Sequence, residues 1–332
     1  GTDAAPNFIQ IPMTAAPIAV ITNLPGITTN IKLSGRVICR IYAGEITTWN
    51  HADILALNPT IKALKTMSAT IKPVARNSGS GTTFIFATFL ATAPGSETDK
   101  CGYSSDNSGQ TATSLSGLNG TILLSDGVMG TRFNKMRATN IIEGNGNQGV
   151  QDAVKNNDYS IGYVEMSYSY LASSTRPGTT NANVRQVAVQ NAFDRTKFLL
   201  PTQSGATAAL AKAQAVGGPE NNPVNPSDSF LQPVNQMSAT AYPIVGYSWL
   251  LVYKNYTSAT GAGQSQVNSG TAPTKGQVEA MIFFFNWSLT KGAVYTPTGT
   301  TVKCFAPLPT AVRTAVIAQL KTVKYDNVTV WR

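Results

Sequence analysis

Short apolar segments with the character of β-strands alternate along this chain with segments of helical periodicity. Strands are predicted at residues 16–23, 69–75, 161–165 and 242–253, and helices at residues 34–42, 52–57, 84–90, 148–156, 207–215, 275–291 and 310–322. Asn50 is predicted to cap the second of these helices. Strands that alternate with helices imply largely parallel sheets covered by helices. A chain of 332 residues is too long for one small core and suits two α/β lobes.

The composition excludes several classes of protein. Hydrophobic residues make up 42 % of the chain, which is too many for a disordered protein. The most apolar stretch, residues 281–287, is short and contains Asn286, so no membrane span is expected. The net charge of +9 comes from scattered Lys and Arg residues without interleaved aromatic side chains, which argues against a nucleic-acid footprint. Only 12 % of residues are charged, and this low fraction suits a protein located outside the cytoplasm.

Cysteine and histidine are too few for a structural metal site. The chain has one histidine, His51, and three cysteines, none of which belongs to a CxxC pair: Cys39, Cys101 and Cys304. A structural zinc ion needs four such ligands gathered in one place. For a secreted chain, three cysteines indicate one disulfide and one odd thiol.

Residues 76–83 carry the strongest functional pattern, because a predicted strand there leads through a glycine-rich turn into a helix. The first backbone N–H groups of a helix have no partner inside the helix, and the helix dipole favours an anion beside them. Gly79 and Gly81 let the backbone approach a ligand closely. Arg76 precedes the turn, and its planar guanidinium can bind a tetrahedral oxyanion through two parallel hydrogen bonds. The pattern predicts an oxyanion site.

The segment Val74-Ala75-Arg76-Asn77-Ser78-Gly79-Ser80-Gly81-Thr82-Thr83-Phe84 resembles the phosphate-binding segment of bacterial periplasmic phosphate-binding proteins, which are the receptors of phosphate ABC transporters. Further stretches are similar to the same family in the same order, so the resemblance covers nearly the whole chain. They are residues 2–4, 23–26, 42–50, 57–59, 161–165, 242–244, 284–287 and 307–309.

This resemblance implies an α/β fold of the class-II periplasmic-binding-protein type, with two lobes and a hinge of two crossovers. Lobe one would comprise residues 1–16 and 243–332, and lobe two residues 17–242, which include the phosphate-binding strand, loop and helix. The implied protein is periplasmic or extracellular, binds inorganic phosphate, needs no cofactor and is not an enzyme. Its implied partner is the permease of an ABC transporter, unless it scavenges phosphate outside the cell.

The resemblance also assigns roles to single residues. Asp3 would accept a hydrogen bond from protonated phosphate, and Arg76 would supply the positive charge. Ser80, Gly81 and Thr82 would donate hydrogen bonds from the start of the helix. Sulfate carries no proton at neutral pH, so it would leave the carboxylate of Asp3 unsatisfied, which costs about 1–3 kcal/mol.

Two departures from the family have consequences. The family has a further segment before the position of Asp3, which includes the first strand of lobe one, so we expect an upstream segment or another chain to complete that lobe. The family commonly has an acidic residue at the position of Ser78, where it orients the arginine. In the secreted DING-type members a bonded pair occupies the positions of Cys39 and Cys101, which implies that disulfide here. Cys304 would then be left over or paired to the upstream segment.

The sequence offers less support for three other functions. A serine hydrolase built on Ser80 would need a base, and His51 reads as a surface residue at a helix start. Asp3 and Glu165 would be a carboxylate pair for glycoside chemistry, but Glu165 ends an apolar strand without a visible partner. The stronger rival is a secreted structural or assembly subunit that reuses the fold, because exposed strand edges attract other chains. Stoichiometric phosphate in the purified protein would separate a receptor from an assembly subunit.

Overall fold

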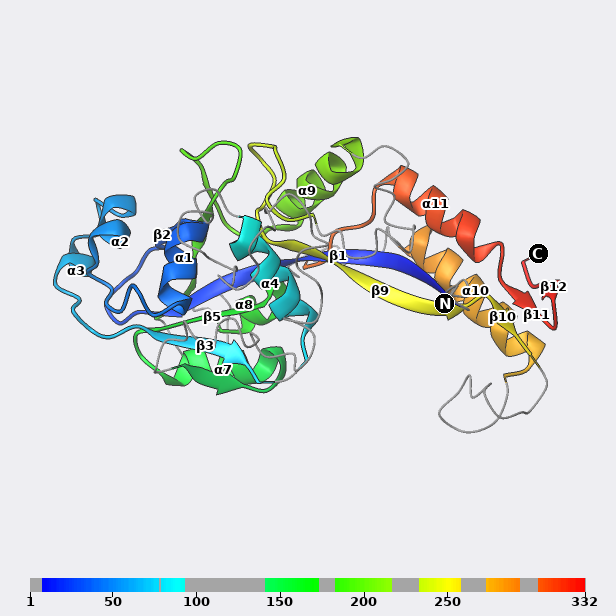
Figure 1. The fold of residues 1–332 in the computed structure, drawn as a ribbon, viewed down its shortest axis with the longest axis horizontal. Helices are drawn as coiled ribbons and strands as arrows, with labels where there is room; N and C mark the ends of the chain where they lie inside the picture. Colours follow the sequence, from blue (N-terminus) through cyan, green and yellow to red (C-terminus); the bar gives the residue numbers. More distant parts are fainter. Residues whose placement is uncertain are drawn as a thin grey trace, which may run out of the picture. The chain divides into compact units, whose positions relative to one another are not determined.

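The computed structural model describes residues 8–77, 79–92, 141–172, 183–216, 233–257, 273–292 and 304–331 (Figure 1). The chain forms two compact units: unit 1 holds residues 1–15, 213–231 and 247–332, and unit 2 holds residues 16–212 and 232–246. The chain passes between the units at four points, and two of these, after residues 15 and 246, lie close to the predicted crossovers. Residues 213–231 group with unit 1, although they were expected in lobe two. That the units are lobes hinged around a ligand stays a prediction.

Unit 2 is built on a mixed β-sheet. Its strands are β1 (Phe8–Asn23), β3 (Lys72–Arg76), β4 (Ile142–Gly144), β5 (Ser160–Glu165) and β6 (Val184–Gln186). They lie in the order β4-β3-β5-β1-β6, and β9 (Val245–Tyr253) also pairs with β1.

The expectation of a largely parallel sheet is wrong for β1. Strand β3 is parallel to both β4 and β5, whereas β1 is antiparallel to β5 and β6. Parallel neighbours need a crossover connection, and helices provide one between β3, β4 and β5. Strand β1 instead enters unit 2 as the continuation of a 16-residue strand that begins in unit 1, so its direction is set by where the chain enters.

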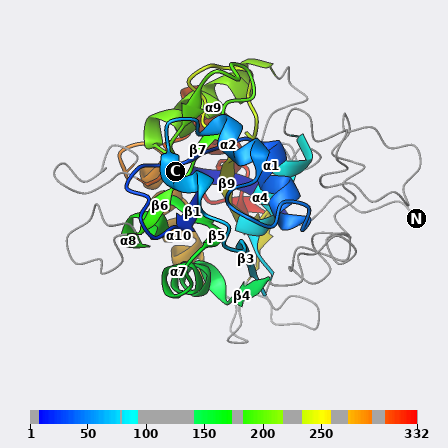
Figure 2. The same cartoon turned by 90° about the vertical axis from the view of Figure 1, so that its left-hand side faces the viewer.

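Helices cover both faces of the β3–β5 pair (Figures 1 and 2). Helix α7 (Gly146–Asn156) packs on one face, where Val150 and Val154 join a buried aliphatic cluster with Val74 and Val164. Gly162 faces the same helix, and a β-carbon there would lie 2.7 Å from Val154 Cγ2. The helix can approach the strand this closely because the position is a glycine.

Aromatic rings form the other face of the same strands. Helix α1 (Gly35–Tyr42) supplies Tyr42, helix α4 (Gly81–Thr92) supplies Phe86 and Phe89, and β5 supplies Tyr163. The rings of Phe86 and Tyr163 are stacked with centroids 4.2 Å apart, and the ring of Tyr42 meets Phe86 edge-on at 5.3 Å. Burial of these rings fixes α1 and α4 against the sheet.

The remaining elements of unit 2 surround this sheet. They are β2 (Lys32–Leu33), β7 (Ala188–Gln190), β8 (Phe198–Leu199), α2 (Ala52–Leu57), α3 (Lys62–Lys65), α8 (Met166–Ala172) and α9 (Gln203–Val216), of which α9 ends in unit 1. The predicted cap of α2 is wrong by one residue. His51 rather than Asn50 caps this helix, because its Nδ1 accepts a hydrogen bond from the backbone N–H of Asp53 at 3.2 Å.

Unit 1 contains the first part of β1 and the last part of β9. It also contains the strands β10 (Asn255–Tyr256), β11 (Lys324–Tyr325) and β12 (Val328–Thr329), and the helices α10 (Lys275–Leu289) and α11 (Thr310–Leu320). The expectation that residues 242–253 form a buried strand holds only at the start, because Leu251 is 65 % exposed. Helix α10 carries exposed Phe283 and Phe284 on its outer face. In the part of the chain that the structure describes, no helix has the length and apolarity to cross a membrane.

Candidate functional site

The carboxyl ends of β3 and β4 lie side by side, and a helix starts just beyond each of them. The register pairs Arg76, the last residue of β3, with Gly144, the last residue of β4. Helix α4 then begins at Gly81 and helix α7 at Gly146. Neither helix has an acidic residue in its first turn, so nothing there neutralises the positive end of either helix dipole. In open α/β sheets this edge is where ligands bind.

The start of α4 is organised as a capped helix with free donors. Ser80 Oγ accepts a hydrogen bond from the backbone N–H of Thr83 at 3.1 Å, and Ser80 O accepts one from the backbone N–H of Phe84 at 3.0 Å. Among the described residues, nothing accepts a hydrogen bond from the backbone N–H groups of Gly81 and Thr82. Ser80 therefore acts first as a helix cap, and its hydroxyl proton is left for a ligand.

The space in front of the turn is open. A β-carbon placed on Gly79 or Gly81 would meet nothing within 4 Å. Neither glycine is thus required by packing inside the protein. As glycines they leave the nearby backbone donors uncovered by a side chain, and the approach of a ligand there stays a prediction.

Arg76 lies at the end of β3 with part of its guanidinium buried. Its Nε is buried and has no hydrogen-bond partner among the described residues. Burial lowers the pKa of the guanidinium from its usual value, while the nearby Tyr163 and Tyr168 act in the opposite direction. An arginine still stays charged at physiological pH, because its ordinary pKa lies far above that range. A buried unpaired donor costs about 1–3 kcal/mol, which an oxyanion at this edge would recover.

Asn147 was not singled out by the sequence analysis, yet it joins the two helix starts. Its Oδ1 lies 3.5 Å from Thr82 Oγ1 and accepts a hydrogen bond from the backbone N–H of Glu165 at 3.3 Å. The signal was present in the chain, since residues 144–147 read Gly-Asn-Gly-Asn directly after a strand. This is a second turn of small and polar residues that opens a helix.

Glu165 does have a partner, contrary to the sequence interpretation. Its Oε1 accepts a hydrogen bond from the backbone N–H of Ser167 at 3.0 Å, and its Oε2 accepts one from the hydroxyl of the same serine. The carboxylate therefore caps the start of α8. This use explains a carboxylate at the end of an apolar strand without any catalytic role.

The turn from β4 into α7 depends on close backbone contact. A β-carbon on Gly144 would lie 2.5 Å from the backbone nitrogen of Val150 and 2.6 Å from the carbonyl carbon of Gly149. We expect Gly144→Ala to lower the free energy of unfolding by about 1–3 kcal/mol, because backbone atoms cannot move aside as a side chain can. Urea denaturation followed by circular dichroism measures this. Gly276→Ala is the control, since nothing lies within 4 Å of a β-carbon there; equal stability of the two variants would contradict the prediction.

Three of the residues discussed for the site and the disulfide lie outside the described residues: Asp3, Ser78 and Cys101. Cys39 in α1 is disulfide-bonded, and Cys304 is a half-buried thiol. The Cys39–Cys101 pairing stays a prediction. The structure brings Arg76, Ser80, Gly81 and Thr82 together at the β3–α4 junction, and their contact with a ligand also stays a prediction.

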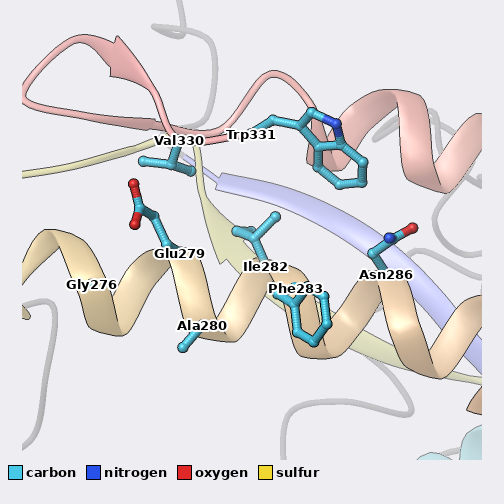
Figure 3. A pocket seen from close by; sticks show the side chains of 8 residues that line it. All are labelled: Gly276, Glu279, Ala280, Ile282, Phe283, Asn286, Val330 and Trp331. Atoms are coloured by element: carbon cyan, nitrogen blue, oxygen red, sulfur yellow. The ribbon is translucent and has the colours of Figure 1, made fainter.

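A pocket of about 400 Å³ lies elsewhere, in unit 1 (Figure 3). Figure 3 shows Glu279, Ile282 and Phe283 on helix α10, where they line one side of the pocket. Val330 and Trp331 line the opposite side. The pocket contains none of the predicted phosphate-binding residues. This separation is physically reasonable, because an anion site at a helix start needs uncovered N–H groups more than an apolar cavity.

Comparison with known proteins identifies the family. Residues 1–265 match the family model of the PBP superfamily domain. The phosphate-binding protein PstS of Methanocaldococcus jannaschii is 26 % identical over 86 % of this chain, and that of Haemophilus influenzae is 24 % identical over 95 %. This chain spans 60 % of the length of the first relative and 73 % of the second.

Solved structures show the same fold. The high affinity periplasmic phosphate-binding protein PfluDING, solved with bound phosphate, has a TM-score of 0.60 at 20 % identity and covers 94 % of this chain and 71 % of its own. A DING protein has a TM-score of 0.58 at 18 % identity, with coverage of 94 % and 72 %. The family match over most of the sequence, the α/β units and the shared fold agree, and the chain therefore belongs to the PBP superfamily.

Proposed function

We propose that this protein binds inorganic phosphate at the edge formed by the end of β3 and the start of α4. The observation that carries the proposal is Arg76, whose buried Nε has no partner among the described residues and which directly precedes a helix start with unused donors. Gly81 and Thr82 supply backbone N–H groups there, and Ser80 supplies a hydroxyl proton. Both relatives described above are named phosphate-binding proteins, which supports the choice of phosphate among oxyanions.

The protein acts as a receptor rather than an enzyme. The one histidine of the chain caps α2 through Nδ1, and Ser80 Oγ accepts the backbone N–H of Thr83, so neither is arranged as a base and nucleophile. The receptor works in the periplasm or outside the cell. It delivers phosphate to the permease of an ABC transporter or scavenges it, and the crossovers near residues 14–16 and 241–243 form the hinge that closes on the ligand.

Titration calorimetry of the complete protein with inorganic phosphate and with sulfate tests the proposal. We expect one phosphate per chain and a much weaker response to sulfate. Absence of phosphate binding in protein freed of bound anion by dialysis would overturn it.

Asp3 is proposed to set the preference for phosphate over sulfate. We expect Asp3→Asn to narrow the difference between the two binding free energies by about 1–3 kcal/mol, because an amide can donate to the unprotonated sulfate oxygen that a carboxylate repels. The same titrations measure this. An unchanged preference in the variant would show that selectivity arises elsewhere.

A second candidate function, assembly with another polypeptide, is favoured by the surface of unit 1. Its described part exposes large apolar side chains on several elements: Leu251 on β9, Phe283, Phe284 and Trp287 on α10, Phe305, and Val328 on β12. Exposed apolar side chains that gather into one patch are typical of contact sites. Multi-angle light scattering over a range of concentrations tests it, with self-association or co-purification of a second chain expected if assembly is the function.

A further inference from the structure

Tyr163 stands in the middle of β5, and its hydroxyl meets both ends of the anion-binding turn. The backbone N–H of Arg76, at the end of β3, donates a hydrogen bond to Tyr163 Oη at 3.3 Å. Thr83 Oγ1, in the first turn of α4, lies 2.8 Å from the same oxygen and shares a hydrogen bond with it. One buried oxygen thus hydrogen-bonds to Arg76, which precedes the glycine-rich turn, and to Thr83, which follows it.

The connection continues into the turn itself. The backbone N–H of Thr83 donates to Ser80 Oγ at 3.1 Å, so the residue held by Tyr163 in turn holds the serine that caps α4. Every predicted phosphate donor of the turn lies between Arg76 and Thr83. A shift at either end would therefore move the donors relative to the guanidinium.

The position of the hydroxyl is itself well determined. Tyr163 is fully buried, and its ring stacks on Phe86 at 4.2 Å and an interplanar angle of 13°. The ring of Tyr42 lies 6.1 Å away on the same face. Burial raises the pKa of the Tyr163 hydroxyl above its usual value, so it remains protonated at physiological pH and can both donate and accept.

We propose that Tyr163 is a positioning residue that holds the anion-binding turn in its binding geometry through its hydroxyl. The inference rests on the phosphate-binding function proposed above. Without the hydroxyl, the backbone N–H of Arg76 and the hydroxyl of Thr83 both lose a buried partner, and the turn gains alternative arrangements. Phosphate binding would then have to order the turn, which lowers the affinity.

The test compares Tyr163→Phe with Tyr42→Phe. Both side chains are fully buried in one aromatic cluster, and each variant loses only a hydroxyl that hydrogen-bonds to backbone. The hydroxyl of Tyr163 bonds to Thr83 Oγ1 as well. Tyr42 Oη donates to Val74 O at 3.0 Å and lies 3.3 Å from Ile161 O, and neither group belongs to the turn. Tyr42→Phe therefore controls for the loss of a buried hydroxyl without touching the site.

Two measurements are made on the full chain. The first is amide hydrogen exchange of peptides covering residues 79–86 in the phosphate-free protein, where Tyr163→Phe is expected to speed exchange and Tyr42→Phe is not. The second is calorimetry with inorganic phosphate, where Tyr163→Phe is expected to raise the Kd on the order of tenfold over the control, as befits the loss of one to two buried hydrogen bonds.

Substitutions at Thr83 change the other partner of the hydrogen bond between Thr83 Oγ1 and Tyr163 Oη. Thr83→Val keeps the shape of the side chain and should repeat the effect of Tyr163→Phe, whereas Thr83→Ser keeps the hydroxyl and should restore slow exchange and tight binding. In the double variant Tyr163→Phe/Thr83→Val, the loss of binding free energy for phosphate should be smaller than the sum of the two single losses. Each single substitution already removes the hydrogen bond that the two residues share.

The outcomes separate the two proposals. Equal exchange in Tyr163→Phe and Tyr42→Phe would overturn the positioning role, and so would an equal Kd for phosphate in the two variants. If the unaltered chain binds no phosphate but Tyr163→Phe still speeds exchange of residues 79–86, the phosphate function is wrong and the positioning of the turn stands.

Discussion

Arg76→Ala is expected to weaken phosphate binding by about 2–5 kcal/mol, the range found when one partner of a buried charge pair is removed. The substitution deletes the positive charge at the strand end and both parallel hydrogen bonds that a guanidinium offers to an oxyanion. Titration calorimetry at fixed ionic strength measures the loss. The guanidinium is half-buried, so salt screens it less than it would an exposed charge.

Arg185→Ala is the matched control for this experiment. Arg185 lies in β6 of the same unit, is also half-buried, and donates through Nε to Ile27 O at 3.1 Å, so its loss changes the net charge equally. Its phosphate affinity should stay within about twofold of the unaltered chain. Arg76→Lys keeps the positive charge but loses the two parallel N–H donors of the guanidinium. Its affinity for phosphate should lie between those of Arg76→Ala and the unaltered chain. If Arg76→Ala and Arg185→Ala weaken phosphate binding equally, the effect of Arg76 comes from net charge alone.

Trp49→Ala is expected to lower the free energy of unfolding of unit 2 by about 3–5 kcal/mol. The indole is fully buried, and its Nε1 donates to Tyr159 O at 3.0 Å. The same carbonyl accepts the backbone N–H of Lys72 at 3.1 Å, so Trp49 secures the chain where both β3 and β5 begin. Removing the ring leaves a large cavity at this end of the two strands that lead to the site.

Chemical denaturation followed by far-ultraviolet circular dichroism measures the effect, with Trp287→Ala as the comparison. Trp287 lies on α10 in unit 1, and 37 % of its surface is exposed, so its removal should cost far less. Trp49→Phe should give an intermediate loss because part of the volume remains. A cost for Trp49→Ala no larger than that for Trp287→Ala would show that the cavity is refilled.

The sequence predicted most elements of unit 2 because its periodicities are local. The bounds of α2 agree to the residue, and α1, α7 and β5 agree within two residues. The cap of α2 was missed because histidine is not among the residues that usually cap helices. The direction of β1 was missed because strand pairing depends on the path of the whole chain.

For the site, the chain itself determined the strand, the glycine-rich turn, the helix start and the arginine before it, since all of these lie within residues 72–92. Only the tertiary structure decided what surrounds them. It placed Tyr163 beneath the turn, Asn147 between the two helix starts, and Glu165 as a cap of α8. These residues come from strands and helices far along the chain, and they meet because parallel strands bring their carboxyl ends to one edge of a sheet.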